Sequence, residues 1–189
     1  MPCMLGPRFD QALVLASDLH RTQVRKESGV PYVAHLLAVT ALAIEHGADE
    51  DQAIAAVLHD AVEDQGGLPT AERIRQQFGQ RVHDLVMALT DATVVPKPPW
   101  RARKEAYLAH LRHAPADALL ISCADKVHNA RSIVDDYAVV GPAIWQRFSG
   151  GRDGTLWYYD QLAAIFRARG PTRLGAMLGE LATAMQRLA

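Results

Sequence analysis

Cysteine is scarce in this sequence, with Cys3 and Cys123 the only two among 189 residues. Two cysteines are too few for a disulfide framework, which excludes the small disulfide-rich secreted class. Cys123 lies in the apolar run Leu119–Ala124, so we expect a buried, inert thiol. No apolar run reaches the roughly 20 residues of a membrane-spanning helix, and the N-terminus lacks the pattern of a signal peptide. These absences predict a soluble cytoplasmic protein.

An excess of charge of either sign is also missing. The chain has 20 Lys and Arg against 21 Asp and Glu, which gives a formal net charge of −1. We therefore expect no global attraction to nucleic acid or to membranes, although a local basic patch can still bind a phosphorylated small molecule. The length predicts one domain over residues 1–189. The sequence does not determine the oligomeric state.

Strand-like alternation of β-branched residues does not recur, and apolar residues follow helical spacing along most of the chain. The pattern predicts an all-α fold, a bundle of roughly nine or ten helices. One expected helix begins near Asp49 or Asp51 and runs to about Asp64; it is apolar nearly all round, which is typical of a central helix. We expect loops at the proline-rich Thr93–Pro99 and at the glycine-rich Ser149–Thr155.

Four ionisable residues, His59, Asp60, Glu63 and Asp64, lie at the end of this most apolar helix. Burial of such groups is unfavourable unless they are paired or bind a metal. The alternative is a solvated last turn, but the helix dipole disfavours three carboxylates at a C-terminus. At helical spacing, one turn can offer a histidine and a carboxylate to a divalent ion.

Two other segments offer further ligand types. His35 lies within an otherwise apolar helical face, where a lone histidine is more often a core residue than a ligand. Asp125 directly follows an apolar run, and Asn129, four residues later, falls on the same helix face. A buried aspartate needs a partner, and a metal ion would serve.

The ordered set His35, His59-Asp60 and Asp125 resembles the H…HD…D signature of the HD-domain metal-dependent phosphohydrolases. The local sequences at 25–35, 58–64 and 124–131 are similar to the hydrolase domain of the Rel/SpoT-type alarmone enzymes. This resemblance extends over residues 8–165 and implies a helical HD fold.

The resemblance also implies a metal centre. It assigns one Mn²⁺ ion to four ligands: His35, His59, Asp60 and Asp125. It assigns Glu63 and Asp64 to orienting and deprotonating the attacking water, and it leaves open which of the two is the base. A second metal would need further ligands; His83, His110 and His113 lie in no ligand motif, so we expect surface positions for them.

The resemblance places five residues in the nucleotide pocket: Arg25, Lys26, Asn129, Ser132 and Tyr158. Either Arg25 or Lys26 can take the base-stacking role, because this chain has one more residue before Ser28-Gly29 than the bacterial pattern. Lys126 lies either at the phosphate mouth of the pocket or in a pair with a carboxylate.

The implied reaction is removal of the 3′-pyrophosphate from (p)ppGpp, which gives GDP or GTP and pyrophosphate. The chain has no room for a synthetase domain or the regulatory domains of the long enzymes, so we expect a stand-alone hydrolase. Two alternatives remain. The same site can act on another nucleotide, such as an adenosine alarmone or the 2′-phosphate of NADPH, or the protein can be a catalytically silent nucleotide-binding module.

Overall fold

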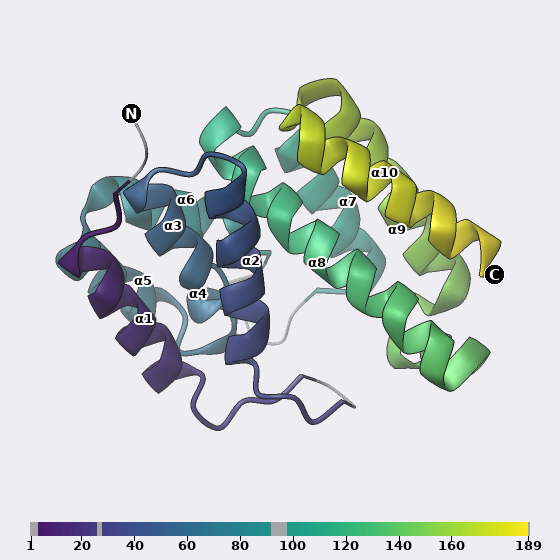
Figure 1. The fold of residues 1–189 in the computed structure, drawn as a ribbon, viewed down its shortest axis with the longest axis horizontal. Coiled ribbons are helices and arrows are strands. Elements are labelled where there is room, and N and C mark those ends of the chain that lie inside the picture. Colours follow the sequence, from purple (N-terminus) through teal and green to yellow (C-terminus); the bar gives the residue numbers. More distant parts are fainter. Residues whose placement is uncertain (1–3, 26–27, 92–97, 189) are drawn as a thin grey trace. The chain divides into compact units, whose positions relative to one another are not determined.

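The computed structural model describes residues 4–25, 28–91 and 98–188. These residues form ten α-helices and one 3-10 helix (Figure 1), and they include one isolated β-bridge, between Val24 and Pro31, but no strand. The predicted all-α class is therefore confirmed. The chain divides into two compact units, residues 1–97 and residues 98–189. No helix in the described part of the chain is both long enough and apolar enough to cross a membrane.

The first unit is built around a buried central helix. Its described helices are α1 (Pro7–Leu19), α2 (Val33–Glu45), α3 (Glu50–Val57), α4 (Ala61–Asp64), α5 (Leu68–Phe78) and α6 (Gln80–Leu89). Helix α3 packs against α1, α2 and α6, and residues 53–58 have no solvent exposure. A capping box starts it: the Gln52 amide donates to Asp49 Oδ1 at 2.9 Å, and Gln52 Oε1 accepts from the Asp49 amide at 2.9 Å. The predicted central position of this helix is confirmed.

The predicted extension of that helix to Asp64 is wrong. Helix α3 ends at Val57, residues 58–60 form a turn, and α4 begins at Ala61. The break contains neither glycine nor proline, so hydrophobic periodicity gives no sign of it. The His59 ring bonds the Ala56 carbonyl, the acceptor that the Asp60 amide would use in a continuous helix. The turn therefore releases His59 and Asp60 from helical register.

The second unit is built around the long helix α8. Its described elements are α7 (Trp100–Leu111), α8 (Ala116–Val140), the 3-10 helix η1 (Gly141–Arg147), α9 (Gly151–Arg169) and α10 (Thr172–Arg187). Helix α8 packs against α9, α10 and η1, and α9 and α10 lie side by side in the yellow-green part of Figure 1. The core of the second unit includes Leu119, Ile121, Leu162, Phe166 and Leu178. The helical spacing of apolar residues directs these side chains to the inside of the unit.

The predicted loop at Ser149–Thr155 is also wrong, because α9 already begins at Gly151. Two of its glycines allow close packing against the Trp100 ring. A Cβ atom at Gly150 would lie 2.6 Å from Trp100 Cη2, and one at Gly154 would lie 3.2 Å from it. The absence of a side chain at these two glycines therefore lets the start of α9 pack closely against the Trp100 indole. Of the loop predicted at Thr93–Pro99, residues 93–97 lie outside the described residues.

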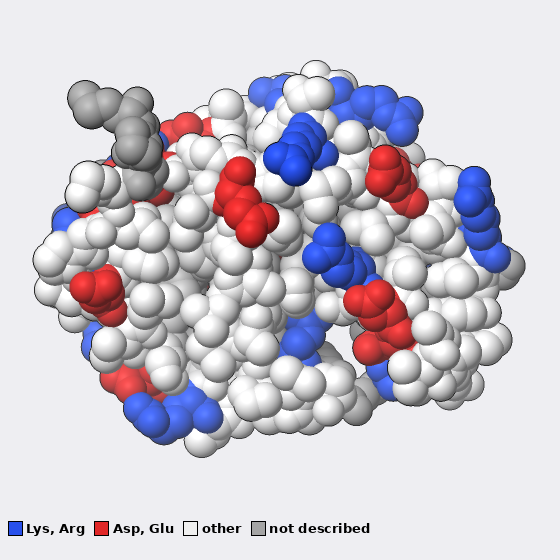
Figure 2. All heavy atoms as spheres, viewed as in Figure 1, with Lys and Arg blue, Asp and Glu red and all other residues white. Residues whose placement is uncertain are grey.

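Charged residues on the face drawn in Figure 2 are of both signs and lie scattered among uncharged ones. Several of the chain's charged residues form ion pairs within the first unit. Arg8 contacts Glu50 at 3.1 Å, and Arg81 contacts Asp49 at 2.7 Å. These pairs are partly exposed, and pairs of that kind contribute at most about 1 kcal/mol each to stability.

Candidate metal centre

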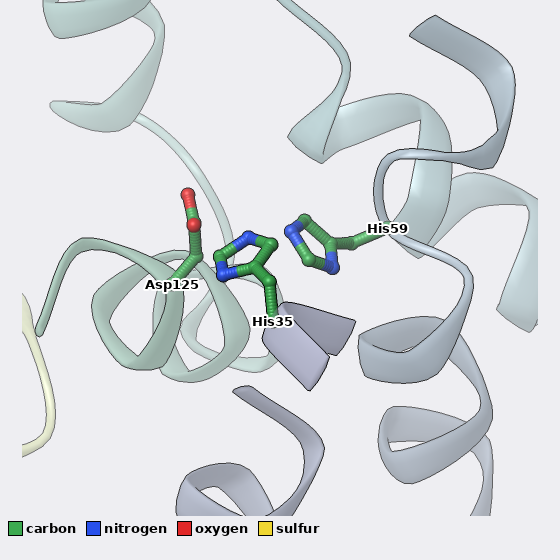
Figure 3. A group of neighbouring side chains, drawn as sticks. All are labelled: His35, His59 and Asp125. Atoms are coloured by element: carbon green, nitrogen blue, oxygen red, sulfur yellow. The ribbon is translucent and has the colours of Figure 1, made fainter. Parts of the chain in front are cut away.

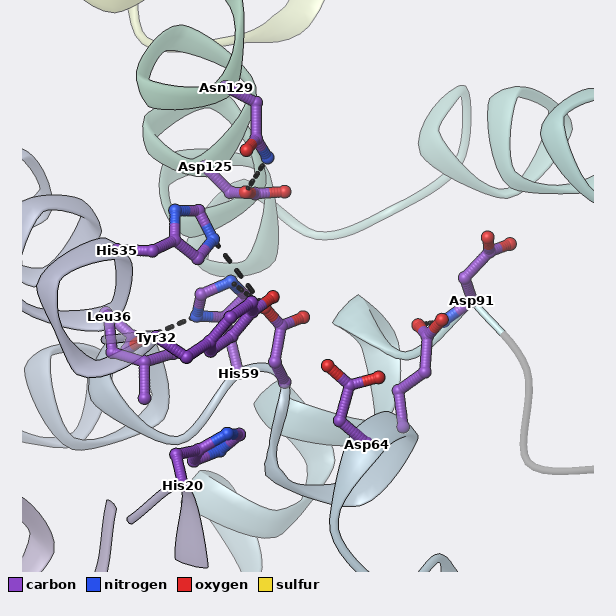
Figure 4. A network of polar contacts seen from close by, with 12 residues as sticks. His20, Tyr32, His35, Leu36, His59, Asp64, Asp91, Asp125 and Asn129 are labelled. Atoms are coloured by element: carbon purple, nitrogen blue, oxygen red, sulfur yellow. Dashed lines mark hydrogen bonds and ion pairs between the residues drawn. The ribbon is translucent and has the colours of Figure 1, made fainter. Parts of the chain in front are cut away.

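Three of the predicted ligands, His35, His59 and Asp60, meet in the first unit. Asp60 Oδ2 lies 3.6 Å from His35 Nε2 and 3.1 Å from His59 Nε2. His35 comes from the first turn of α2, and the other two come from the turn between α3 and α4. Both rings are buried, with 1% and 4% of their side-chain surface exposed. Helix α2 and the break after α3 therefore aim two imidazoles at one carboxylate oxygen. Figure 4 labels the two histidines, His35 and His59.

The His59 ring is fixed by its own backbone. His59 Nδ1 lies 2.8 Å from the Ala56 carbonyl oxygen, so it carries the hydrogen and donates it. In the neutral ring, Nε2 is then the lone-pair nitrogen, and this atom faces Asp60. A carbonyl that holds one ring nitrogen of a histidine while the other points to a metal is the usual outer arrangement of a histidine ligand.

The electrostatics of Asp60 favour a cation at this point. Burial raises the pKa of Asp60, but His59 and His35, in their protonated forms, outweigh burial through their charge and hydrogen bonds and hold that pKa well below its usual value. The carboxylate is therefore ionised. A bound metal ion would take the place of those protons, with the two neutral rings as its ligands. An ionised oxygen beside two imidazole nitrogens is a mixed N/O donor set, which suits divalent Mn, Fe or Zn. The residues present thus fit a divalent metal ion.

Tyr32 supplies a further contact to the same oxygen. Its hydroxyl donates to Asp60 Oδ2 at 2.6 Å, and its ring meets the His35 ring edge to face with centroids 5.5 Å apart. Tyr32 immediately precedes α2, so the start of this helix positions both the tyrosine and His35. The sequence assigned this residue no separate role, although it lies within the motif that ends at His35.

The two predicted catalytic carboxylates, Glu63 and Asp64, lie on α4 and have different partners. Glu63 is half-buried, and its Oε2 accepts a hydrogen bond from the Asp91 backbone amide at 3.1 Å. Asp64 is exposed, and its Oδ2 accepts from Gln23 Nε2 at 2.8 Å. Gln23 and the Asp91 amide were not anticipated, because neither lies in a recognisable motif.

In the second unit, Asp125 is buried on α8, with 8% of its surface exposed. Its Oδ1 accepts from Asn129 Nδ2 at 2.5 Å, and its Oδ2 accepts from Lys126 Nζ at 2.6 Å. Of the two positions considered for Lys126, the structure therefore has the carboxylate pair. Burial lowers the pKa of Lys126, but the charge of Asp125 outweighs it and holds that pKa well above its usual value.

Figure 3 draws His35 and His59 of the first unit and Asp125 of the second, three buried residues whose side chains are candidate ligands for a metal ion. Of the histidines expected to have no ligand role, His110 and His113 are exposed, as predicted. His83 is half-exposed and contacts Asp84 through Nδ1 at 2.9 Å.

The predicted substrate residues lie in both units. Arg25 is half-buried, and its amide donates to the Val30 carbonyl at 2.8 Å, whereas Lys26 lies outside the described residues. Ser132 donates its hydroxyl to the His128 carbonyl at 3.1 Å. Tyr158 is buried beside Trp100, with ring centroids 6.3 Å apart. Burial raises the pKa of Tyr158 well above its usual value, so its hydroxyl stays neutral.

The HD-domain family model matches residues 12–156 of this chain. The chain belongs to the HD-domain family. The matched range includes all four predicted ligands of this HD-domain protein, and it spans parts of both units. The family resemblance inferred from the motifs is thus confirmed.

Relatives of this HD-domain protein include named alarmone enzymes. It is 36% identical over 132 residues to guanosine-3′,5′-bis(diphosphate) 3′-pyrophosphohydrolase MESH1 of Xenopus tropicalis, an alignment that covers 66% of this chain and 71% of the relative. The MESH1 protein of Danio rerio is 33% identical, with 70% and 73% covered. The bifunctional (p)ppGpp synthase/hydrolase SpoT of Escherichia coli (strain K12) is 33% identical over 67% of this chain but only 18% of its own length.

Solved structures show the same similarity. A metazoan ortholog of SpoT, described as hydrolysing ppGpp and acting in starvation responses, matches with a TM-score of 0.78 and 27% identity over 97% of each chain. The protein lmo0812 of Listeria monocytogenes EGD-e matches with a TM-score of 0.68 and 27% identity, covering 82% of this chain and 97% of the other.

Proposed function

We propose that this HD-domain protein hydrolyses (p)ppGpp to GDP or GTP and pyrophosphate. The observation that carries the proposal is the approach of His35 and His59 to Asp60, at 3.6 Å and 3.1 Å, with Glu63 and Asp64 on the next helix. The MESH1 relatives named for this reaction support the choice of substrate, because the chain covers 71% of the frog protein.

The proposed ligand set is His35, His59 and Asp60 from the first unit with Asp125 from the second, and the proposed metal is Mn²⁺. Donor type supports all four residues, burial supports His35, His59 and Asp125, and the range matched by the family model includes all four. We accordingly regard residues 1–189 as one hydrolase domain. Once bound, the ion would supply Lewis-acid stabilisation of the charge that develops on the phosphate oxygens.

The chemistry proposed for this site is attack of water on the phosphorus next to the ribose 3′-oxygen. The water oxygen forms a bond to that phosphorus while the bond from the phosphorus to the 3′-oxygen breaks. The nucleotide departs through its 3′-oxygen, which gains a proton, and the pyrophosphate product carries the water oxygen. Glu63 and Asp64 orient the water, and one of them takes its proton. Glu63 is held by the Asp91 amide and Asp64 by Gln23, so both carboxylates are fixed before substrate binds.

The nucleotide is proposed to contact Arg25, Lys26, Asn129, Ser132 and Tyr158. The guanidinium of Arg25 is suited to stacking on a base or to forming a forked contact with phosphate. Asn129 presents an amide next to Asp125, suited to a ribose hydroxyl or a phosphate oxygen. Tyr158 brings a neutral hydroxyl, since burial keeps it protonated. The cytoplasm, where nucleotides are abundant, is the proposed location.

The test is a substrate panel with the Mn²⁺-loaded protein. We expect release of pyrophosphate from ppGpp and pppGpp, and little product from an adenosine alarmone or NADPH. Turnover of the adenosine alarmone or NADPH without turnover of ppGpp and pppGpp would show that guanosine alarmones are not the substrate. Tight binding of ppGpp without turnover would identify a nucleotide-binding module instead.

A further inference from the structure

We propose that His20, Gln23 and Tyr32 are positioning residues that hold the carboxylates of Asp60 and Asp64 for the reaction. This proposal rests on the proposed function, because it assigns those carboxylates to it. None of the three residues lies on a described helix; they lie between α1 and α2, where His20 directly follows α1 and Tyr32 directly precedes α2.

Gln23 is the link to Asp64, and its neighbours decide which way its amide points. Its Oε1 lies 2.7 Å from His20 Nδ1 and 2.5 Å from Gln65 Nε2. An oxygen with two donors beside it is the acceptor end of the amide. The other end, Nε2, must therefore donate, and it does so to Asp64 Oδ2 at 2.8 Å.

His20 has the properties required to orient Gln23. It is buried, with 2% of its surface exposed, and burial is the main reason that its pKa is lowered. A neutral ring carries one hydrogen, and the contact with Gln23 Oε1 places it on Nδ1. The other nitrogen, Nε2, is buried without a hydrogen-bond partner, which a lone-pair nitrogen tolerates better than an N–H group does.

Tyr32 is the link to Asp60. Its ring stacks on the His20 ring with centroids 5.4 Å apart and an interplanar angle of 16°. Its hydroxyl donates to Asp60 Oδ2 at 2.6 Å. The Tyr32 amide also donates to the Gln23 carbonyl at 2.9 Å. The two links are thus joined by one stack of rings and one backbone hydrogen bond. Figure 4 labels His20 and Tyr32, the two residues of the stack.

This arrangement would hold two carboxylates of the proposed site in place. Asp60 and Asp64 are four residues apart, and Asp64 is exposed. Each carboxylate receives one donor from the same segment of chain, which limits its rotation. A hydrogen bond that fixes a ligand or base in its reactive orientation typically matters more to turnover or metal affinity than to folding.

The Gln23 link is tested with Gln23→Glu, which keeps the oxygen that accepts from His20 and Gln65 and replaces only the group that donates to Asp64. We expect kcat for ppGpp to fall about tenfold with little change in KM. In an Asp64→Asn background the same change should have no further effect on kcat. Gln77→Glu, which makes the same charge change on the exposed face of α5, is the matched control.

Two results would overturn this link: an unchanged kcat in Gln23→Glu, or an equal loss in both backgrounds. Thermal unfolding gives an independent check, because in the double variant the asparagine amide introduced at position 64 can donate to the carboxylate introduced at position 23. The double variant should therefore melt above the temperature expected from adding the two single effects. Simple addition of the two shifts would contradict a direct contact.

The Tyr32 link is tested without substrate. Tyr32→Phe keeps the stacked ring and removes the hydroxyl, so we expect Mn²⁺ affinity measured by calorimetry to fall about tenfold or more. The control is Tyr137→Phe, the same substitution at a tyrosine whose ring packs against Trp145. Unchanged affinity would refute the link. If wild type binds Mn²⁺ but leaves ppGpp intact, the proposed function fails, while the calorimetric comparison still decides the positioning role.

Discussion

Replacing Glu63 by glutamine separates chemistry from folding at this site. The Glu63 carboxylate accepts the Asp91 amide at 3.1 Å, and the glutamine oxygen can accept the same hydrogen bond. We therefore expect the free energy of unfolding to change by less than about 1 kcal/mol. Glu63 is not among the proposed ligands, so bound metal should stay at the wild-type level.

The expected loss is in turnover. A positioned acid or base contributes about 10²- to 10⁴-fold to a rate. At roughly 1.36 kcal/mol for each factor of ten, this is about 2.7 to 5.4 kcal/mol of activation free energy. The assay is pyrophosphate release from ppGpp at saturating substrate, with the metal content of each sample measured by elemental analysis.

Asp64→Asn is the companion variant for this experiment. Its oxygen can still accept from Gln23, so its fold should also persist. The variant with the larger loss of kcat identifies the base, and the other carboxylate is then the one that orients water. Near-normal turnover by fully metallated Glu63→Gln would remove Glu63 from the mechanism.

The other predictions concern the ligands, the packing and the thiol. His59→Ala and Asp125→Ala should each abolish metal binding together with activity, and an unchanged metal content by elemental analysis would refute the ligand assignment. Gly150→Ala should lower stability by about 1 to 3 kcal/mol in denaturant unfolding, because its Cβ would lie 2.6 Å from the Trp100 ring; an unchanged midpoint would contradict this packing. Burial raises the pKa of the Cys123 thiol to about 12, so at about pH 8 almost none of it is thiolate. In a Cys3→Ser background it should react with a thiol reagent only after unfolding, and rapid labelling of the folded protein would contradict its burial.

The residue types of the metal centre were readable from the sequence. His59 and Asp60 follow the most apolar helix, where ionisable groups require a partner, and the HD signature extends the set to His35 and Asp125. The structure brings His35, His59 and Asp60 together within the first unit. The ligand role of all four residues stays a prediction, as does the identity of the metal.

The local geometry was less predictable. A helix continuing through His59 was expected because no glycine or proline interrupts the pattern, yet a contact between the His59 ring and the Ala56 carbonyl accompanies the break. Local composition predicts a loop at Gly150 and Gly154, although these glycines make room for the Trp100 indole, which is distant in sequence. Both errors arise because a tertiary or side-chain contact decides the backbone, and local spacing does not encode such contacts.

The positioning residues were missed for a related reason. His20 and Gln23 lie in a polar segment that has no apolar periodicity, and the role of Gln23 depends on Asp64, a partner 41 positions away in the sequence. Their spacing of three residues was the only local sign, since it allows a contact between the two side chains. A sequence pattern can indicate which residues have side chains suited to catalysis or metal binding. Which side chain donates and which accepts at each contact can be identified only from the folded structure.

The most direct test of the central claim is analysis of the products from ppGpp incubated with the Mn²⁺-loaded wild-type protein. The account predicts GDP and pyrophosphate in equal amounts, with loss of both products when the metal is chelated and their return when Mn²⁺ is restored. Release of single phosphate groups in place of pyrophosphate, or equal turnover in the presence of the chelator, would contradict it.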